Sequence, residues 1–200
     1  MSSRSERTRA KILESAQRLL VERGYHGVGL EEIARGAGVS RQAIYLHFRS
    51  KADLLVAMAQ HGDESVGIPE ILRPVREAKT ALEALDEAVA AYAAIQPRIY
   101  DIASVTYAAR RSDPAAEAVW QDRMASRRGN IRQDMERLQR EGLLADGWDA
   151  EEATDFVWSL LSLHTYEYLV VELGWPIERF VRRLRTMLRC NLVNGQEGRS

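Results

Sequence analysis

Arg41 and Gln42 stand next to each other at the start of a short helical segment, and both side chains suit the edges of DNA bases. Arginine can donate two parallel hydrogen bonds to guanine, and glutamine can pair bidentately with adenine. Ala43 is small enough for close approach and can touch a thymine methyl group. Tyr45 and His47 follow within two turns and can reach bases or phosphates. This set of residue types indicates contact with double-stranded DNA.

The surrounding residues predict a helix-turn-helix over residues 30–48, with one helix over 30–36 and the next from Arg41 to about His47. Ala34 is small where two helices must cross closely, and Gly38 permits the sharp turn between them. Ser40 can cap the second helix, which places the first turn of that helix at the major groove. Lys51, at the start of the next helix, can meet a phosphate. The alternative is a helical hairpin that contacts no DNA.

Charge is distributed unevenly along the chain of 200 residues, whose formal net charge is only -1. Residues 1–51 hold ten basic and five acidic side chains, and the remainder carries an excess of six acids. A cationic segment joined to an anionic one favours a part that binds polyanions and a part with another task. The residues therefore predict a DNA-binding domain over 1–51, a linking helix over 51–61, and a ligand-binding and dimerisation domain over 52–200.

The hydrophobic pattern of the whole chain has a helical period, and it predicts an all-α fold of about nine helices. Glycines and prolines over 62–74 indicate a loop or hinge, and Pro97 is expected to end the helix before it. A further helix is expected up to about residue 111, a long one from Pro114, and a last one beginning near Pro176. The segment from Asp149 to Val171 is apolar nearly all round, so we expect one helix there that is buried on two sides.

The amino-terminal segment resembles the tetracycline-repressor-like (TetR-type) transcriptional regulators. The resemblance covers about residues 5–58 and rests on Glu32-Ile33-Ala34, Gly38-Val39-Ser40, Ile44-Tyr45-Leu46-His47-Phe48 and Ser50-Lys51-Ala52-Asp53-Leu54-Leu55. It implies a homodimer of nine-helix subunits, a palindromic operator and a ligand pocket in the carboxy-terminal domain. It also implies that Arg41, Gln42, Ala43, Tyr45, His47 and Lys51 face the DNA.

One position departs from the family pattern. Members often carry threonine or serine where this chain has Val28 and Gly29, and that hydroxyl both caps the helix and touches a phosphate. Gly29 can still cap the helix at a small cost, and its backbone N–H can still meet a phosphate. We therefore keep Gly29 among the residues expected to contact DNA.

The carboxy-terminal part is rich in aromatic and polar side chains at positions expected to face inward. An arginine beside an apolar stripe can pair with an anionic ligand, although such a side chain more often reaches water or an acid. A histidine there can orient a ligand, although a histidine satisfied within the core is the more common case. The candidates for an unidentified small-molecule effector are Tyr92, Tyr100, Tyr107, Trp120, Met124, Arg127, Phe156 and His164.

The last two expected helices form a candidate dimer interface, since a helix without a polar face needs cover on a second side. A central core helix in a monomer is the alternative. The interface candidates are Trp158, Leu161, Tyr166, Leu169, Phe180, Leu184 and Leu188.

Other function classes find little support in these residues. The single cysteine excludes a disulfide framework and a zinc site built on cysteines. Neither a P-loop nor a GxSxG, HExxH or Glu-x-x-His pattern is present, so we expect no catalytic residue, cofactor or metal site. Without a membrane-length apolar run or a secretory signal, a cytoplasmic protein is expected. We expect a ligand-released repressor, with a DNA-binding architectural protein or, less favoured, a helical enzyme as the alternatives.

Overall fold

The computed structural model is built of helices, which confirms the all-α prediction. It describes residues 4–194, except the side chains of residues 63–65. Within that range no β-strand forms, and Leu144 and Val193 make one isolated antiparallel bridge. The chain folds into two compact units, one containing residues up to 66 together with 99–123, the other containing 67–98 and residues from 124 onward. The functional division expected at residue 51 stays a prediction.

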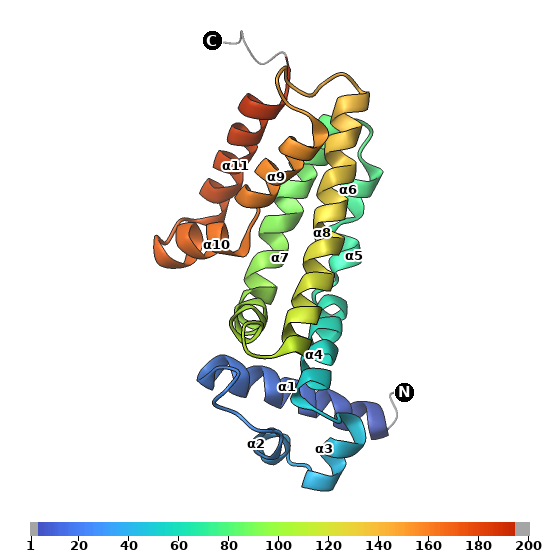
Figure 1. The fold of residues 1–200 in the computed structure, drawn as a ribbon, viewed down its shortest axis with the longest axis vertical. Helices are drawn as coiled ribbons and strands as arrows, with labels where there is room; N and C mark the ends of the chain where they lie inside the picture. Colours follow the sequence, from blue (N-terminus) through green and yellow to red (C-terminus); the bar gives the residue numbers. More distant parts are fainter. Residues whose placement is uncertain (1–3, 195–200) are drawn as a thin grey trace. The chain divides into compact units, whose positions relative to one another are not determined.

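The first unit begins with four helices, α1 (Arg4–Arg23), α2 (Leu30–Gly36), α3 (Arg41–His47) and α4 (Lys51–Val66) (Figure 1). The bounds of α2 and α3 are those that the sequence predicts. Gly38 adopts a left-handed φ of 67° in the turn between them, as expected of a residue without a Cβ atom.

A small hydrophobic core fixes these helices against one another. Ile12 and Leu20 of α1, Ile33 of α2, Ile44 of α3 and Leu54 of α4 are fully buried. Each such side chain contributes roughly 1.5–3 kcal/mol when removed from water. The two short helices are therefore held by burial, because helices of seven residues are not stable alone.

The second unit contains α5 (Ile68–Ile71), α6 (Arg73–Glu77), α9 (Ala150–Leu160), α10 (Leu163–Tyr166), a π-helical turn η1 (Glu167–Glu172) and α11 (Ile177–Leu192). Two long helices, α7 (Ala81–Ala109) and α8 (Pro114–Arg140), contribute residues to both units. Phe180 of α11 is fully buried, with its ring 6.2 Å from that of Tyr92 and 6.0 Å from that of Tyr166. Arg189 and Asp86 form an ion pair that joins α11 to α7.

Three predicted boundaries are wrong. Residues 62–74, expected to be a loop, are largely helical in α4, α5 and α6, and prolines occupy the first turns of α5 and α6, where their missing N–H costs nothing. Pro97 does not end a helix but lies inside α7, since a long packed helix can bend at proline instead of stopping. The expected single helix over 149–171 is broken after Leu161, where the Ser162 side chain caps a new helical start.

Candidate nucleic-acid interface

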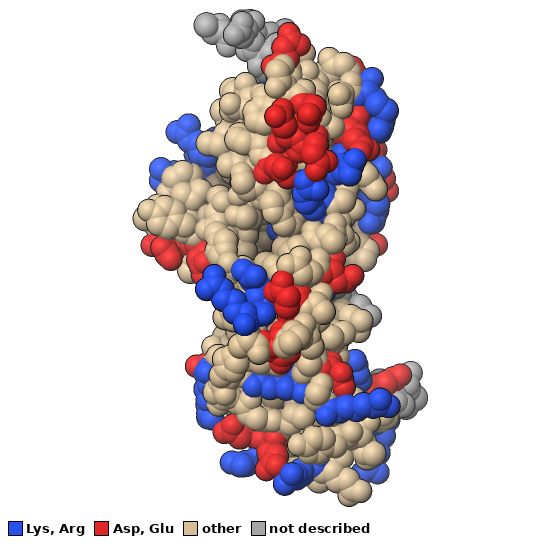
Figure 2. All heavy atoms as spheres, in the orientation of Figure 1, with Lys and Arg blue, Asp and Glu red and all other residues tan. Residues whose placement is uncertain are grey.

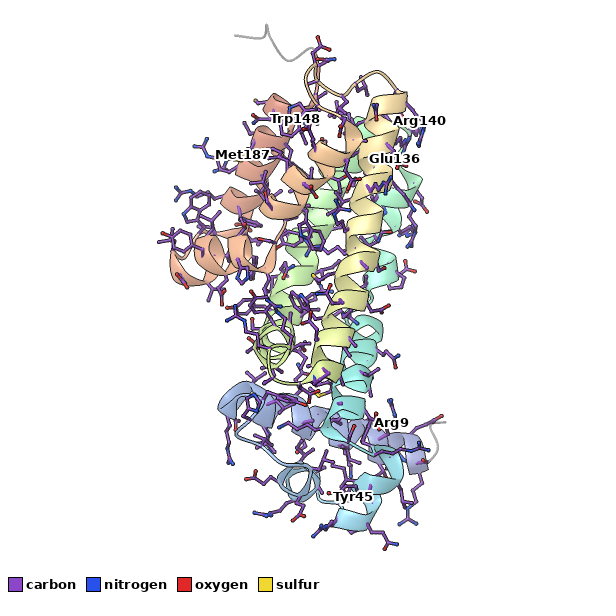
Figure 3. The ribbon with its side chains drawn as sticks, viewed as in Figure 1. Arg9, Tyr45, Glu136, Arg140, Trp148 and Met187 are labelled. Carbon is purple, nitrogen blue, oxygen red and sulfur yellow. The ribbon has the colours of Figure 1, made fainter. Side chains whose placement is uncertain are left out.

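The first turn of α3 presents polar side chains on an exposed surface. Ser40 Oγ accepts a hydrogen bond of 3.1 Å from the backbone N–H of Ala43, so the helix begins with its N-terminus capped. Arg41 and Gln42 are exposed, whereas Ala43 is half-buried. Tyr45 is 44% exposed and lies at the outer side of α3 (Figure 3). The structure thus places the predicted base-reading side chains together on one accessible turn.

Leu46 is a surface residue of α3 that the sequence reasoning missed. Its side chain is 80% exposed, the largest exposed fraction among the bulky apolar side chains described. The sequence could have indicated this exposure, because Leu46 lies between Ile44 and Phe48, whose side chains both face the core. An apolar side chain so exposed beside Arg41 and Tyr45 is suited to contact thymine methyl groups or sugars.

Arg41 forms an ion pair with an acidic residue of the preceding helix. Its Nη1 lies 2.9 Å from Glu31 Oε1 of α2, and its guanidinium carbon lies 6.0 Å from the centre of the Tyr45 ring. Both partners of the ion pair are more than half exposed, so the pair adds little to stability. The pairing aligns the side chain beside α3 without burying it.

A polar-lined groove of about 570 Å³ runs beside α3 within the first unit. Arg9 and Arg49 line it together with Tyr45 and His47, and His47 is half-buried. The Arg9 guanidinium lies 5.4 Å from the ring centre of Phe48, and Figure 3 shows Arg9 on α1. Arg9 is therefore a candidate phosphate ligand that no local sequence pattern indicates, because only tertiary packing brings α1 next to α3.

Lys51 and Gly29 already have partners in the protein. Lys51 Nζ donates to the carbonyl oxygens of Val28, at 2.7 Å, and of Tyr25, and it lies 4.0 Å from the ring centre of Tyr25. Burial lowers the pKa of this ammonium group. The N–H of Gly29 donates to Glu32 Oε2 at 3.2 Å, so it is not freely available to a phosphate as expected. Phosphate contacts by these two residues stay predictions.

The turn after α1 is also bonded to the connection between α7 and α8, within the same unit. The Tyr25 hydroxyl donates to Asp113 Oδ2, and His26 Nε2 lies 2.7 Å from Ser112 Oγ. Burial and the neighbouring carboxylate raise the pKa of Tyr25, and the hydrogen bond from Tyr25 lowers the pKa of Asp113. These polar contacts connect the helix-turn-helix with residues far along the chain.

The residues predicted to form an effector pocket fall in two units. The first contains Tyr100, Tyr107 and Trp120, with the rings of Tyr107 and Trp120 5.0 Å apart. The second contains Tyr92, Met124, Arg127, Phe156 and His164. His164 does not face inward as expected: its side chain is 58% exposed and lies 3.6 Å from Glu167, because α10 begins anew after the break and changes the helical phase.

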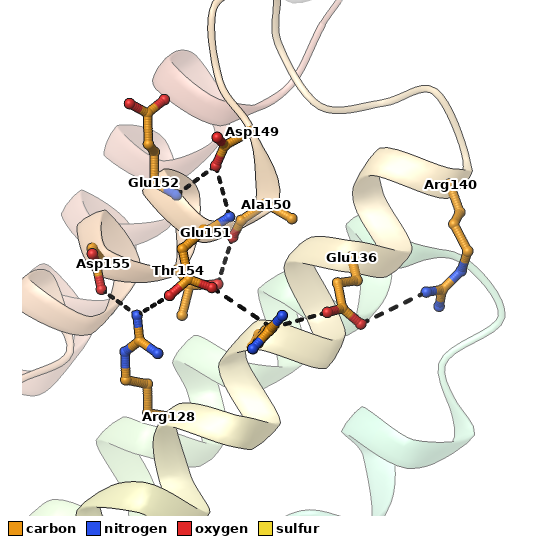
Figure 4. Close-up of polar contacts among 10 residues, drawn as sticks. Arg128, Glu136, Arg140, Asp149, Ala150, Glu151, Glu152, Thr154 and Asp155 are labelled. Carbon is orange, nitrogen blue, oxygen red and sulfur yellow. Dashed lines mark hydrogen bonds and ion pairs between the residues drawn. The ribbon is translucent and has the colours of Figure 1, made fainter.

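Arg128, next to Arg127 on α8, belongs to an ionic network at the surface. Its Nη2 lies 2.6 Å from Glu151 and 2.7 Å from Asp155, both on α9, and Arg132 lies 3.7 Å from Glu151 (Figure 4). Figure 2 shows acidic and basic side chains gathered side by side over this part of the second unit. The network neutralises Arg128.

Most of the predicted dimer contacts lie inside the chain itself. Leu161, Tyr166, Phe180, Leu184 and Leu188 are at most 5% exposed, so that part of the interface prediction does not fit. Tyr166 of α10 packs against Phe180 of α11, with their ring centres 6.0 Å apart. Only Trp158 and Leu169 are half-buried.

Other apolar side chains are exposed on η1, at Leu173 directly after it and on α11. The exposed fractions are 57% for Tyr168, 49% for Val171, 54% for Leu173 and 45% for Met187, which Figure 3 marks on α11.

Neither a metal site nor a membrane-spanning segment is evident in the part of the chain that the structure describes. Among those residues, no three histidine, cysteine or acidic side chains come together in a group able to hold a metal ion. None of the described helices is both long and apolar enough to cross a membrane.

Residues 12–58 match the tetR family of bacterial regulatory proteins. Over 87 residues the chain is 42% identical to the HTH-type transcriptional activator FasR of Mycolicibacterium smegmatis. That similarity spans 42% of this chain and 39% of the relative.

Solved structures extend the likeness of the fold to nearly the whole chain. The transcriptional regulator FadR of Bacillus subtilis, solved with stearoyl-CoA, has a TM-score of 0.72 at 20% identity, with 90% of this chain and 96% of that one covered. A protein from Saccharomonospora viridis, solved with choline, has a TM-score of 0.77 at 22% identity, with 94% and 98% covered. At these identities the likeness concerns the fold alone.

Proposed function

We propose that this chain, whose residues 12–58 belong to the tetR family of bacterial regulatory proteins, is a DNA-binding transcriptional regulator that responds to a small molecule. The observation that carries the proposal is the capped, exposed first turn of α3, with Arg41, Gln42 and Tyr45 on one accessible surface. A helix that only packs within a bundle does not require polar, base-reading side chains on an exposed first turn.

In this proposal α3 enters the major groove with its N-terminal turn first. Arg41 leaves Glu31 and donates its fork to a guanine, and Gln42 pairs with an adenine. Arg9 and Arg49, which line the groove beside α3, meet the phosphates on either side. Base contacts then supply sequence preference, and phosphate contacts supply most of the affinity and its dependence on salt.

Two copies act together as a homodimer on a palindromic operator. A pair of half-sites read by two α3 helices lies one turn of DNA apart, roughly 34–36 Å. We assign the contact between copies to the exposed apolar residues Tyr168, Val171, Leu173 and Met187 of η1 and α11 and the turn between them. Bulky apolar side chains exposed on neighbouring elements are a feature of protein interfaces.

The second unit receives the effector. Proteins of similar fold were solved with stearoyl-CoA and with choline, so this architecture accommodates small ligands of different charge. A ligand shifts the protein away from DNA only if it binds the DNA-free arrangement more tightly. Release of the operator by the effector, and hence repression in its absence, is the direction we propose.

Selection of bound sequences from random duplex DNA tests the DNA-binding part. Purified protein near physiological salt should recover a palindrome, and Gln42→Ala should change the preferred base in each half-site while leaving the salt dependence unaltered. Gln121→Ala, which changes an exposed glutamine of α8, is the matched control and should select the wild-type sequence.

Recovery of no sequence, with binding that disappears as salt rises, would refute a sequence-reading regulator. That outcome would favour an architectural DNA-binding protein instead, because its affinity rests on phosphates alone.

A further inference from the structure

Arg127 of α8 is a buried cation without an anionic partner in the described part of the second unit. Its Nη2 atom is buried and has no hydrogen-bond partner. Burial lowers the pKa of the guanidinium, and the neighbouring Tyr92 opposes that shift. Arg128, one residue later, is instead satisfied by two carboxylates at the surface.

Two aromatic rings flank the Arg127 guanidinium. Its central carbon lies 4.8 Å from the ring centre of Tyr92 on α7 and 5.2 Å from that of Trp158 on α9. The Tyr92 ring is fixed, because its hydroxyl donates to the carbonyl of Ser162 at 2.8 Å. Rings that approach a guanidinium engage its π face, whereas its N–H groups point outward in the plane. Of these groups, Nη2 is buried and has no acceptor in the protein, so it is the donor that a carboxylate could pair with.

Gln96 of α7 supplies a second buried polar atom without a hydrogen-bond partner. Gln96 is 3% exposed, and its Oε1 is buried without a hydrogen bond. It follows Tyr92 by four residues, so the two side chains project from the same side of the helix. A buried donor on α8 and a buried acceptor on α7 are both costly to leave unsatisfied.

We propose that Arg127 is the receptor for the negative charge of the effector, which is an organic carboxylate with an apolar body. This inference rests on the proposed function and names the chemical class of its ligand. The carboxylate accepts two parallel N–H bonds from the guanidinium, a geometry specific to arginine. The rings of Tyr92 and Trp158 contact the apolar body, and Gln96 accepts a hydrogen bond where the ligand offers a donor.

Paired ligands that differ only in charge test the proposal. Benzoate and octanoate are titrated into the purified full-length protein by calorimetry, each against its neutral amide. At least one carboxylate should bind wild type at least tenfold more tightly than its amide does, and Arg127→Gln should abolish that preference. Arg128→Gln removes the same charge one residue away, outside the site, and should retain it.

The stability of the ligand-free protein separates a binding role from a structural one. Arg127→Met replaces an uncompensated buried charge by an apolar side chain, so its melting temperature should equal or exceed that of wild type. A lower melting temperature by several degrees would show that Arg127 supports the fold. That result would overturn the proposal, as would equal binding of carboxylate and amide by wild type.

The same variants distinguish failure of this inference from failure of the proposed function. If the protein selects a palindrome but binds no carboxylate in preference to its amide, Arg127 is not a ligand receptor and the regulator proposal stands. If carboxylates bind through Arg127 but no DNA sequence is selected, the site stands and the regulator proposal fails. Release of selected DNA by the carboxylate, lost in Arg127→Gln, supports both.

Discussion

Glu31 holds the arginine that we assign to base recognition, and this ion pair has a testable consequence. Its carboxylate lies 2.9 Å from Arg41 and is exposed on α2. Removing it frees the guanidinium and removes a negative charge close to the phosphates. Glu31→Gln should therefore raise DNA affinity by roughly three- to tenfold at low salt, with a smaller gain at high salt. Fluorescence anisotropy with a labelled operator measures both values.

Glu22 provides the matched control for this prediction. It lies in the same unit and pairs with Arg18 on α1 at 3.7 Å. Glu22→Gln makes the same change in charge without freeing Arg41. An equal gain in affinity in both variants would mean that net charge alone is responsible, and no gain in Glu31→Gln would contradict the proposed role of Arg41.

Asp134 of α8 makes the stability of the protein depend on pH. Burial raises the pKa of its carboxyl group to about 6, and nearby Arg137 opposes the shift. Because the folded pKa exceeds that of the unfolded chain, the unfolded state loses its proton first as pH rises. Stability therefore falls between about pH 4 and 6 and stays lower above that range.

Asp134→Asn should remove this loss. The variant should be more stable than wild type by roughly 2 kcal/mol at pH 7 and equal to it near pH 4. Thermal denaturation from pH 4 to pH 8 measures the difference, with Asp122→Asn, a change at an exposed carboxylate of α8, as the control. A constant difference across this range would contradict a raised pKa at Asp134.

Residue identities in the sequence indicate possible contacts but not which neighbour faces inward. Arg127 and Arg128 are adjacent and of the same type, yet one is buried between rings and the other pairs with acids at the surface. Only the position of α9 against α8 separates them. The sequence pattern that predicts an inward-facing His164 continues through Ser162, where the structure breaks the helix.

At the level of helices, the capping serine of α3 controls the surface that meets DNA. Ser40 Oγ satisfies the backbone N–H of Ala43, which otherwise has no partner inside the helix. Ser40→Ala should destabilise the protein by about 1 kcal/mol and weaken operator binding, since the frayed first turn carries Arg41 and Gln42. Chemical denaturation and operator titration measure the two effects.

Ser159 of α9 is the control for the cap. Its hydroxyl donates to the Phe156 carbonyl within its own helix, so Ser159→Ala leaves every helix terminus as it is. The change in stability should stay within about 0.5 kcal/mol. If Ser40→Ala were as mild as Ser159→Ala, the cap would not be what organises this turn.

Helix boundaries were predictable where local residues determine them. The cap at Ser40, the left-handed Gly38 and the Asp113-Pro114 start of α8 act through neighbours in sequence, and the structure confirms all three. Pro97 lies inside α7, and at the break after Leu161 the carbonyl of Ser162 accepts a hydrogen bond from Tyr92, far away along the chain. Sequence pattern alone does not report such packing.

At the level of the whole molecule, the sequence predicts that a second copy covers one surface, but burial decides which surface. Five of the seven residues predicted to contact a second copy are buried within the single chain. The apolar side chains that remain exposed lie on η1, on α11 and in the turn between them. An interface built there adds to a core that the chain already completes by itself.

Charge placed on this surface should therefore separate the copies without unfolding them. The double variant Val171→Glu, Leu173→Glu puts two carboxylates on each copy, at positions 49% and 54% exposed. Light scattering should give twice the chain mass of 22.6 kDa for wild type and the single mass for the variant. Loss of the dimer should also weaken binding to a palindrome far more than binding to a half-site.

Val21→Glu is the control, because it adds a carboxylate at a valine of α1 that is 40% exposed, and this variant should stay dimeric. If the double variant also stayed dimeric, the interface between the copies would lie elsewhere.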